Sequence, residues 1–494
     1  MRKYLRAAPM LLLLGLGLVA CRREQPDRTV ERRTQSDEAN PKPHRTEPPP
    51  IAGGRRAQAR ALSPWEAYRT GRIERRVLEV PEKIQQGIFR KPEKYVEPLV
   101  SFLVAGARDD FHRAKLLHDW VAQNIEYDVQ GYFSGDYKSR GTGFSDTLRN
   151  GSSVCDGYAG LFEHMCGLAG LECVKVSGYG RGYGHRLFRP EDPTKSNHAW
   201  NAVKIAGNWH LMDITWDAGH IADSREYTRR YRTDYLFLEP EKFLHTHLPT
   251  EEKWQLLAPP VSVDEFRDLP YLRGEFFGCG LDLAEPVAAL TQVGDSATVD
   301  LLVPEGVQLL AQVTTAEDEE VENLTFIETA TGAARVQALF PRAGQWKLRL
   351  FAGANGSGRE ERNEKETGHP SRGREGSAGN EPAHYDWVGD LAYEAAEGTD
   401  RRFPTTTTQF ASLGSRLLEP RFGPLPQSRP LRFALDVPGV SGVAVFQDGD
   451  WTKLEQQEGT LWSGTATLRS SGSVKVVVQL EPEDRQWESI LLFD

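Results

Sequence analysis

A cysteine, a histidine and an aspartate stand in an order and a spacing that could support thiol chemistry. Cys155 follows the turn-forming residues 150–153 and begins a segment with helical periodicity. The first turn of a helix leaves backbone N–H groups free and carries a partial positive charge, which stabilises a thiolate or an oxyanion. Gly157 is expected to let an acyl substrate approach the backbone. A small residue that starts a buried helix would look the same, so Cys155 alone does not define a nucleophile.

His198 and Asp213 supply the two partners that an activated thiol needs. His198 begins a predicted strand, 198–205, and Asp213 lies on a second predicted strand, 208–216, which returns from a tight turn at Ala206 and Gly207. In antiparallel pairing about that turn, the two residues share one sheet face, roughly 5–7 Å apart by backbone. The carboxylate can then orient the imidazole and stabilise its charged form.

Other titratable residues are placed less favourably. His164 falls nine residues after the cysteine in the same predicted helix, about two and a half turns away, and is expected to be a packed or surface residue. His185 lies in a Gly-rich loop and is a candidate for the cleft wall. His210 is expected on the sheet face opposite Asp213. Asp217 has the same alternation as Asp213 but lies past the expected strand end, so it is the weaker alternative.

The elements that must position these residues form a predicted α+β domain over residues 61–258. Residues 111–125 have the periodicity of an amphipathic helix, which Asp109 or Asp110 can cap. A second helix is predicted over 155–167 and a strand over 171–176. The tryptophans of this region, Trp200, Trp209 and Trp216, are expected in the core and the cleft wall.

After this domain the pattern changes to short alternating strands. Residues 261–353 predict a β-sandwich, and residues 385–494 predict a second one. Residues 354–384 are charged and of low complexity, which predicts a disordered linker between the two sandwiches.

The N-terminus has the features of an export signal. Residues 1–20 combine a basic start with the short apolar run LLLLGLGLVA, which is typical of a signal peptide. The residues Leu18-Val19-Ala20-Cys21 resemble the bacterial lipobox, which implies cleavage before Cys21 and its lipidation. Residues 21–60 predict a disordered tether. Arg22 and Arg23 after the cleavage point favour the outer membrane, so we expect a cell-envelope lipoprotein that faces the periplasm or the surface and contacts the membrane through its lipid.

Composition and cysteine use exclude several other classes. A net charge of −10 and a pI near 5.8 argue against a nucleic-acid partner. Besides Cys21, four cysteines in so long an exported chain do not make a disulfide framework. Cys166 and Cys173 could pair, although ordinary buried thiols are favoured. The spacing of Cys155, His164, Cys166 and Cys173 does not fit a zinc site. No calcium-binding loop is recognisable in the sequence, so neither a metal nor a cofactor is predicted.

Three sequence blocks carry a family resemblance. Residues 150–160 (NGSSVCDGYAG), 197–205 (NHAWNAVKI) and 209–216 (WHLMDITW) resemble those of the transglutaminase-like superfamily, most of all the kyphoscoliosis peptidase-like proteins, which also share the HDWVAQNIEYD helix and downstream β modules. The resemblance implies a papain/transglutaminase-like fold followed by two Ig-like β-sandwiches. It also implies that Cys155 is the nucleophile, His198 the base and acid, and Asp213 the residue that orients the histidine.

These features predict cysteine-dependent acyl transfer on peptide or amide bonds through a Cys155 thioester, with a protein or peptide as substrate. Water as acceptor would give a peptidase or amidase, whereas an amine would give a protein-crosslinking transglutaminase; peptidase-like hydrolysis is favoured. The alternative is a catalytically inactive scaffold lipoprotein whose sandwiches bind protein or glycan. Nothing in the sequence predicts an oligomeric state.

Overall fold

The computed structural model describes residues 62–222, 224–354, 385–469, 472–483 and 486–493. The predicted signal peptide, Cys21, the tether and nearly all of the predicted linker lie outside these residues. Within the described part of the chain, no helix is both long and apolar enough to cross a membrane.

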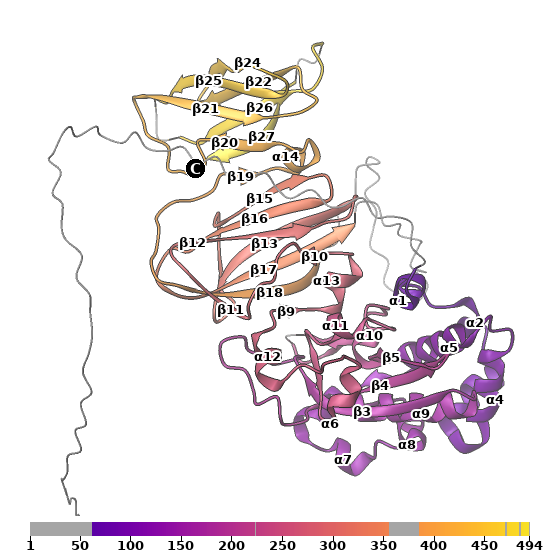
Figure 1. Cartoon of the computed structure of the whole chain (residues 1–494). Coiled ribbons are helices and arrows are strands. Elements are labelled where there is room, and N and C mark those ends of the chain that lie inside the picture. The colour runs from indigo at the N-terminus through magenta and orange to yellow at the C-terminus, as the bar shows by residue number, and fades with distance from the viewer. Residues whose placement is uncertain (1–61, 223, 355–384, 470–471, 484–485, 494) are drawn as a thin grey trace, which may run out of the picture. The chain divides into compact units, whose positions relative to one another are not determined.

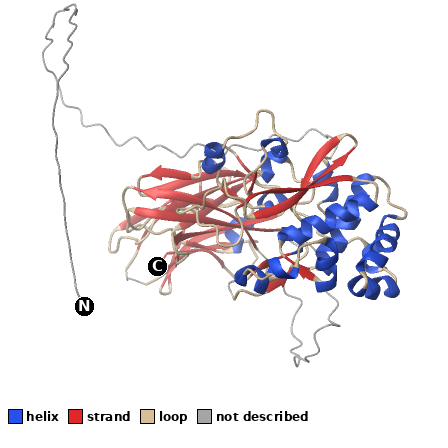
Figure 2. Cartoon of the chain, turned by 90° about the horizontal axis from the view of Figure 1, so that it is seen from below, coloured by secondary structure: helices blue, strands red, loops and turns tan. Residues whose placement is uncertain are grey.

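The first domain consists of helices gathered around one small sheet (Figure 1). Figure 2 shows that the helices are concentrated here, whereas the rest of the described chain is built mainly of strands. The longer helices are α3 (Glu82–Arg90), α4 (Pro92–Val104), α5 (Asp110–Asn124), α8 (Phe144–Asn150) and α9 (Cys155–Leu168). The short ones are α1 (Pro64–Tyr68), α2 (Arg75–Leu78), α6 (Val129–Ser134), α7 (Tyr137–Arg140), α10 (Ile214–Ala218) and α11 (Pro240–Phe243).

Four antiparallel strands form the sheet in the order β5-β4-β3-β8. They are β3 (Glu172–Gly180), β4 (His198–Ile205), β5 (Asn208–Met212) and β8 (His247–Pro249). The tight turn between β4 and β5 is confirmed: Ile205 pairs with Asn208, and both Ala206 and Gly207 have positive φ, as a two-residue hairpin turn requires. Helix α9 packs against β3 and β4, which places its first residue beside the start of β4.

Helix α5 begins where the sequence predicts, but it is not amphipathic. Asp109 caps it by accepting a hydrogen bond from the backbone N–H of His112. Residues 114–122 are all buried, including Lys115, His118 and Asp119. The helix packs against α4, α9, α10 and β4, so it is the central helix of the domain and its charged residues must find partners inside.

The first β-sandwich has two sheets with strand orders β10-β12-β16-β15 and β11-β18-β17-β13-β14. The first sheet contains β10 (Asp282–Leu283), β12 (Ser296–Leu302), β15 (Thr325–Ala330) and β16 (Ala333–Leu339). The second contains β11 (Leu290–Val293), β13 (Val307–Thr315), β14 (Glu320–Val321), β17 (Gly344–Ala354) and β18 (Asp386–Ala395).

The predicted boundary of the second sandwich is therefore wrong. Strand β18 lies after the predicted linker, yet it pairs with β17 on one side and with β11 on the other (Figure 1). It also pairs with β9 (Tyr271–Leu272), which comes between α12 (Val263–Asp268) and α13 (Gly274–Gly278). The predicted linker thus interrupts the first sandwich, since a strand's partner is set by packing and not by the charged segment before it.

The second sandwich begins after β18. Its sheets have the orders β19-β27-β26-β22-β23 and β20-β21-β25-β24. The strands are β19 (Thr405–Thr406), β20 (Arg416–Glu419), β21 (Pro430–Asp436), β22 (Gly442–Gln447), β23 (Asp450–Lys453), β24 (Glu455–Gln456), β25 (Leu461–Thr467), β26 (Val474–Gln479) and β27 (Glu488–Phe493), with the short helix α14 (Thr408–Ser412).

The position of β18 leads to a prediction about cleavage. If a protease recognition sequence is inserted between residues 355 and 384 and cut, we expect the two fragments to stay together in size-exclusion chromatography, because β18 is hydrogen-bonded to β17, β11 and β9. Denaturant should separate them. As a control, a chain that ends at residue 354 should be insoluble or clearly less stable. Separation of the fragments in native buffer would contradict the strand order.

Candidate active site

Cys155 is the first residue of α9, as predicted. Its N-cap, Val154, has no side-chain oxygen to offer, so the N–H groups of the first helical turn are not capped by a side chain. These groups and the helix dipole face a sulfur that is neither fully buried nor disulfide-bonded. The arrangement favours the negative charge of a thiolate or of an oxyanion beside it.

His198 and Asp213 meet through a short hydrogen bond. His198 Nε2 lies 2.6 Å from Asp213 Oδ2, and the Asp213 carboxylate is completely buried. Because Nε2 contacts the carboxylate, Nδ1 is the ring nitrogen that remains for the thiol. Burial disfavours charge on His198, but the charges of Asp213 and Cys155 and hydrogen bonds to both raise its pKa to about 10. The histidine therefore holds a proton at neutral pH beside the sulfur.

The predicted strand that carries Asp213 ends earlier than expected. Strand β5 stops at Met212, and Asp213 is the N-cap of α10, where its Oδ1 accepts a hydrogen bond from Trp216 N at 3.2 Å. The register still matches the prediction, since Asn201 pairs with Met212 and the next pair along would be Trp200 and Asp213. An aspartate that caps a helix is held by the backbone as well as by its side-chain partners, so its carboxylate is firmly oriented.

His247 is a third partner that the sequence did not reveal. It lies on β8, opposite Gly180 of β3, and its Nε2 is 3.1 Å from the same Asp213 Oδ2. Burial lowers the pKa of His247 to about 4, although the hydrogen bond to Asp213 opposes this change. The neutral ring therefore donates Nε2–H to the carboxylate while Nδ1 accepts from the Thr246 hydroxyl at 2.8 Å. Burial alone would raise the Asp213 pKa, but His198 and His247 hold it far below its usual value.

Aromatic rings enclose the catalytic candidates. Trp216 stacks on His198 with ring centroids 5.1 Å apart and lies 4.3 Å from the His247 ring, so it forms part of the cleft wall as predicted. Burial raises the pKa of both Tyr127 and Tyr132, and the charge of Cys155 is the next cause for each. Both hydroxyls therefore lie within electrostatic reach of the sulfur, which sequence reasoning did not anticipate.

The same side chains could in principle hold a metal ion. Ligand atoms of His198, Asp213 and His247 all lie within 4.8 Å of one another. Both imidazoles, however, direct Nε2 at one carboxylate oxygen at 2.6 and 3.1 Å, which are hydrogen-bond lengths. The arrangement suits a proton on each ring better than a shared cation.

Asp217, the weaker alternative to Asp213, belongs to a separate buried network. Its Oδ2 lies 3.1 Å from His118 Nε2, and its Oδ1 accepts from Tyr235 N. His118 Nδ1 contacts Asp119, which also accepts from Lys115 Nζ at 2.6 Å. This network joins α5 to α10, the helix that Asp213 caps, so it holds the helix whose N-cap is the carboxylate of the candidate triad.

The remaining predicted residues lie mainly as expected. His164 stacks on Phe144 away from the site, and His210 packs edge-on against Phe111. His185 lines the cleft that His198 also lines, as predicted. The prediction for Gly157 is wrong: a Cβ there would lie 2.0 Å from Ser153 Oγ, so this glycine is required for internal packing and not for substrate approach.

The three other cysteines in the described part of the chain are free thiols. Cys166 is buried, and Cys173 and Cys279 are partly buried. Burial, together with a hydrogen bond to Cys173, raises the pKa of Cys166 well above its usual value. Burial raises the pKa of Cys279 to about 12. Cys166 and Cys279 are therefore poor nucleophiles at neutral pH.

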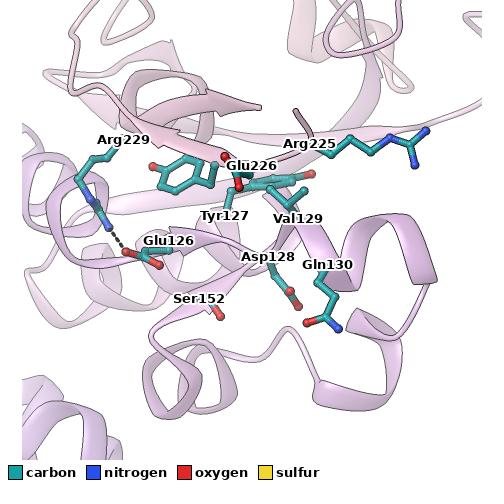
Figure 3. A pocket seen from close by; sticks show the side chains of 10 residues that line it. Glu126, Tyr127, Asp128, Val129, Gln130, Ser152, Arg225, Glu226 and Arg229 are labelled. Atoms are coloured by element: carbon teal, nitrogen blue, oxygen red, sulfur yellow. Dashed lines mark hydrogen bonds and ion pairs between the residues drawn. The ribbon is translucent and has the colours of Figure 1, made fainter. Parts of the chain in front are cut away.

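Two hollows adjoin at Tyr127 and Tyr227, which line both of them. The smaller one, of about 500 Å³, is shown in Figure 3. There Glu126 pairs with Arg229, while Arg225 points away from the other side chains. The larger one is a cleft of about 1100 Å³ that contains His198 and Trp216.

Asp213 and Asp217 form a matched pair for mutation. Asp213→Asn should slow alkylation of Cys155 by iodoacetamide at pH 6.5 by about tenfold or more, because the imidazolium loses its charged partner. Asp217→Asn should leave this rate close to that of the parent but lower the free energy of unfolding by about 3 kcal/mol, because His118 loses a buried partner.

Both quantities are measured on both variants, by mass-spectrometric alkylation rates and by denaturant unfolding. If Asp217→Asn slowed alkylation as much as Asp213→Asn while the protein stayed folded, the assignment of Asp213 as the orienting carboxylate would be wrong.

Comparison with known proteins supports the assignment of the domains. The family model described as the transglutaminase-like superfamily matches residues 98–214, and the model of the KY-like, immunoglobulin-like domain matches residues 263–363. The chain is 32% identical to kyphoscoliosis peptidase of Mus musculus over 259 residues, and 32% identical to that of Homo sapiens over 262 residues. These matches cover 52% and 53% of this chain but only 38% of each relative.

Among solved structures, a putative cysteine protease from Cytophaga hutchinsonii is similar at 19% identity, covering 31% of this chain and 48% of that one, with a TM-score of 0.20. The chain thus spans less than half the length of the curated relatives that it matches. Its core has the papain/transglutaminase-like fold and a β-rich, Ig-like region follows it. The chain thus contains a transglutaminase-like domain and, after it, a KY-like immunoglobulin-like domain.

Proposed function

We propose that this protein is a cysteine-dependent acyltransferase that attacks peptide or amide bonds, with Cys155 as nucleophile. The observation that carries the proposal is the buried Asp213 carboxylate at 2.6 Å from His198, whose other ring nitrogen remains for a sulfur at the start of α9. A superfamily relationship alone leaves the activity open, so the argument depends on these contacts.

The chemistry follows from the protonation states of the site. The Cys155 thiolate attacks the carbonyl carbon, and the backbone N–H groups at the very start of α9, with the positive end of its dipole, stabilise the oxyanion. His198 then donates its proton to the leaving amine, and the C–N bond breaks to leave a thioester. For release, His198 takes a proton from the incoming acceptor as it attacks the thioester carbonyl. The C–S bond then breaks, the acyl group leaves on the acceptor, and the Cys155 thiolate is restored beside the protonated His198. Asp213 stabilises the charged imidazole throughout.

We favour water as the acceptor, which makes the reaction peptidase- or amidase-like hydrolysis. The relatives named as peptidases support this choice. An amine acceptor would give a crosslinked product from the same thioester, and the product of the reaction distinguishes the two outcomes.

Selective thiol labelling tests the nucleophile directly. At pH 6.5, iodoacetamide should modify Cys155 at least tenfold faster than Cys166, Cys173 or Cys279, which serve as internal controls because burial raises the pKa of Cys166 and Cys279. His198→Ala should abolish this preference. Peptide mapping by mass spectrometry gives the rate at each thiol. Equal slow labelling of all four would instead favour a scaffold without catalysis.

We also propose that the protein is a cell-envelope lipoprotein anchored through Cys21. The support is the lipobox-like sequence at residues 18–21, which lies outside the described residues. Expression in a Gram-negative host with a labelled fatty acid should give a lipid-modified protein in the membrane fraction, and Cys21→Ser should give an unlabelled one. Label in the Cys21→Ser variant would rule out this anchor.

A further inference from the structure

The cleft beside His198 has two walls of different origin. One wall contains residues of the loop after β3, together with Trp216 and the β6 (Gly219–Ile221) and β7 (Tyr227–Arg229) segments. The other contains residues 316–318, which join β13 to β14, and residues of β17 and β18. The first sandwich thus supplies part of the surface that surrounds the candidate site.

The charge of this cleft is opposite to that of the chain. Eight arginine or lysine residues line it, compared with four aspartate or glutamate residues. The chain as a whole has a net charge of −10. The average composition of an acidic chain does not account for a cleft with more basic than acidic side chains. Such a cleft attracts negatively charged ligands.

Part of this excess is held in ion pairs, which cross between the two walls at Asp386 and lie within the wall of the first sandwich at Asp318. Arg230 and Arg232 both contact Oδ1 of Asp386, and Lys347 and Arg349 both contact Oδ1 of Asp318. Each of these two carboxylates therefore faces two cations. These ion pairs stabilise the cleft walls; the Asp386 side chain is 18% exposed, whereas that of Asp318 is 51% exposed beside its two cations.

The uncompensated charge lies on the loop after β3. Arg181, Arg186 and Arg189 all line the cleft, and none of them forms an ion pair with a described residue. Arg181 is buried and donates only to backbone carbonyls, to His245 O at 3.2 Å, Leu269 O at 2.9 Å and Phe266 O at 2.5 Å. Burial lowers its pKa to about 10, so it stays charged at neutral pH. Arg186 and Arg189 are exposed at the rim.

Aromatic side chains accompany these arginines. Tyr183 of the same loop is 46% exposed and contacts Phe133 of α6 at 5.6 Å between ring centroids. The Trp387 ring of β18 contacts the guanidinium groups of Arg273 and Arg349, which lie 4.6 and 4.7 Å from its centroid. Flat rings beside guanidinium groups suit an extended polypeptide that alternates apolar contacts with carboxylates.

We propose that this cleft selects an acidic polypeptide, with aspartate or glutamate side chains near the residue that Cys155 attacks. The carboxylates would bind the exposed Arg186 and Arg189, the buried charge of Arg181 would add to the positive potential, and the main chain would pass along the aromatic side chains towards His198. The proposal deepens the proposed function, since it names the substrate class of that site. Its binding claim, however, can be tested without catalysis.

The test measures binding to the full chain carrying Cys155→Ala. Three fluorescent peptides of equal length are compared by anisotropy: one rich in glutamate, one with glutamine at the same positions and one with lysine. We expect the acidic peptide to bind at least tenfold more tightly than the glutamine peptide at 50 mM salt. This preference should shrink at 300 mM salt, because exposed charges are screened.

Charge reversal at the rim locates the effect. Arg186→Glu with Arg189→Glu should weaken binding of the acidic peptide at least tenfold and leave the glutamine peptide unchanged. Lys83→Glu with Arg90→Glu is the matched control, since both residues are exposed on α3 and do not line the cleft. If the reversed rim lowers the unfolding midpoint, the glutamine replacements R186Q and R189Q take its place.

The proposal is overturned if the glutamine or lysine peptide binds as tightly as the acidic one, or if the control on α3 has the same effect as the reversed rim. Failure of the proposed function gives a different result. Slow alkylation of Cys155 in the parent together with preserved binding of acidic peptides would indicate an acidic-peptide receptor that has no thiol chemistry.

Discussion

The structure of the site depends on one buried carboxylate. Asp213 has no exposed surface, and it receives hydrogen bonds from two imidazoles and from the backbone N–H of Trp216. A buried anion is costly unless its lone pairs are satisfied, and here three donors from β4, β8 and α10 satisfy them. The three elements are therefore tied together where the chemistry is proposed, and His198 is held charged beside the sulfur.

The same region contains a second, separate set of buried charges. Lys115, His118, Asp119 and Asp217 pair with one another between α5 and α10. Asp213 and Asp217 begin and end the same short helix, yet their partners do not overlap. The first set is open to the cleft through His198, whereas the second is fully enclosed. Both sets contain histidine and aspartate, so residue type does not distinguish them. The Asp213 set can exchange protons with a ligand because His198 lines the cleft, whereas the enclosed Asp217 set can only maintain packing.

Local pattern was sufficient to predict much of the site. The helix that begins at Cys155, the turn at residues 206–207 and the register that brings Asp213 to His198 all follow from periodicity and turn chemistry. His247 could not be found this way, because its three-residue strand has no recognisable pattern and its partner β3 lies far away in sequence. The prediction that α5 is amphipathic was wrong for a related reason. Its charged residues are buried because segments distant in sequence pack against them and supply some of their hydrogen-bond and ion-pair partners. The predicted strand was too long because α10 follows β5 directly after Asp213, with no glycine or proline to mark the change from strand to helix.

The order of the strands also bears on how the protein is assembled. Every residue of the candidate triad precedes residue 214, but one wall of the cleft includes Asp386 and Trp387 of β18. A chain that emerges from the ribosome N-terminus first would thus expose its thiol and imidazole to solvent before that wall exists. During synthesis the imidazole would spend an interval beside an incomplete cleft, and the proposed selectivity for a substrate would arise only once most of the polypeptide has been made.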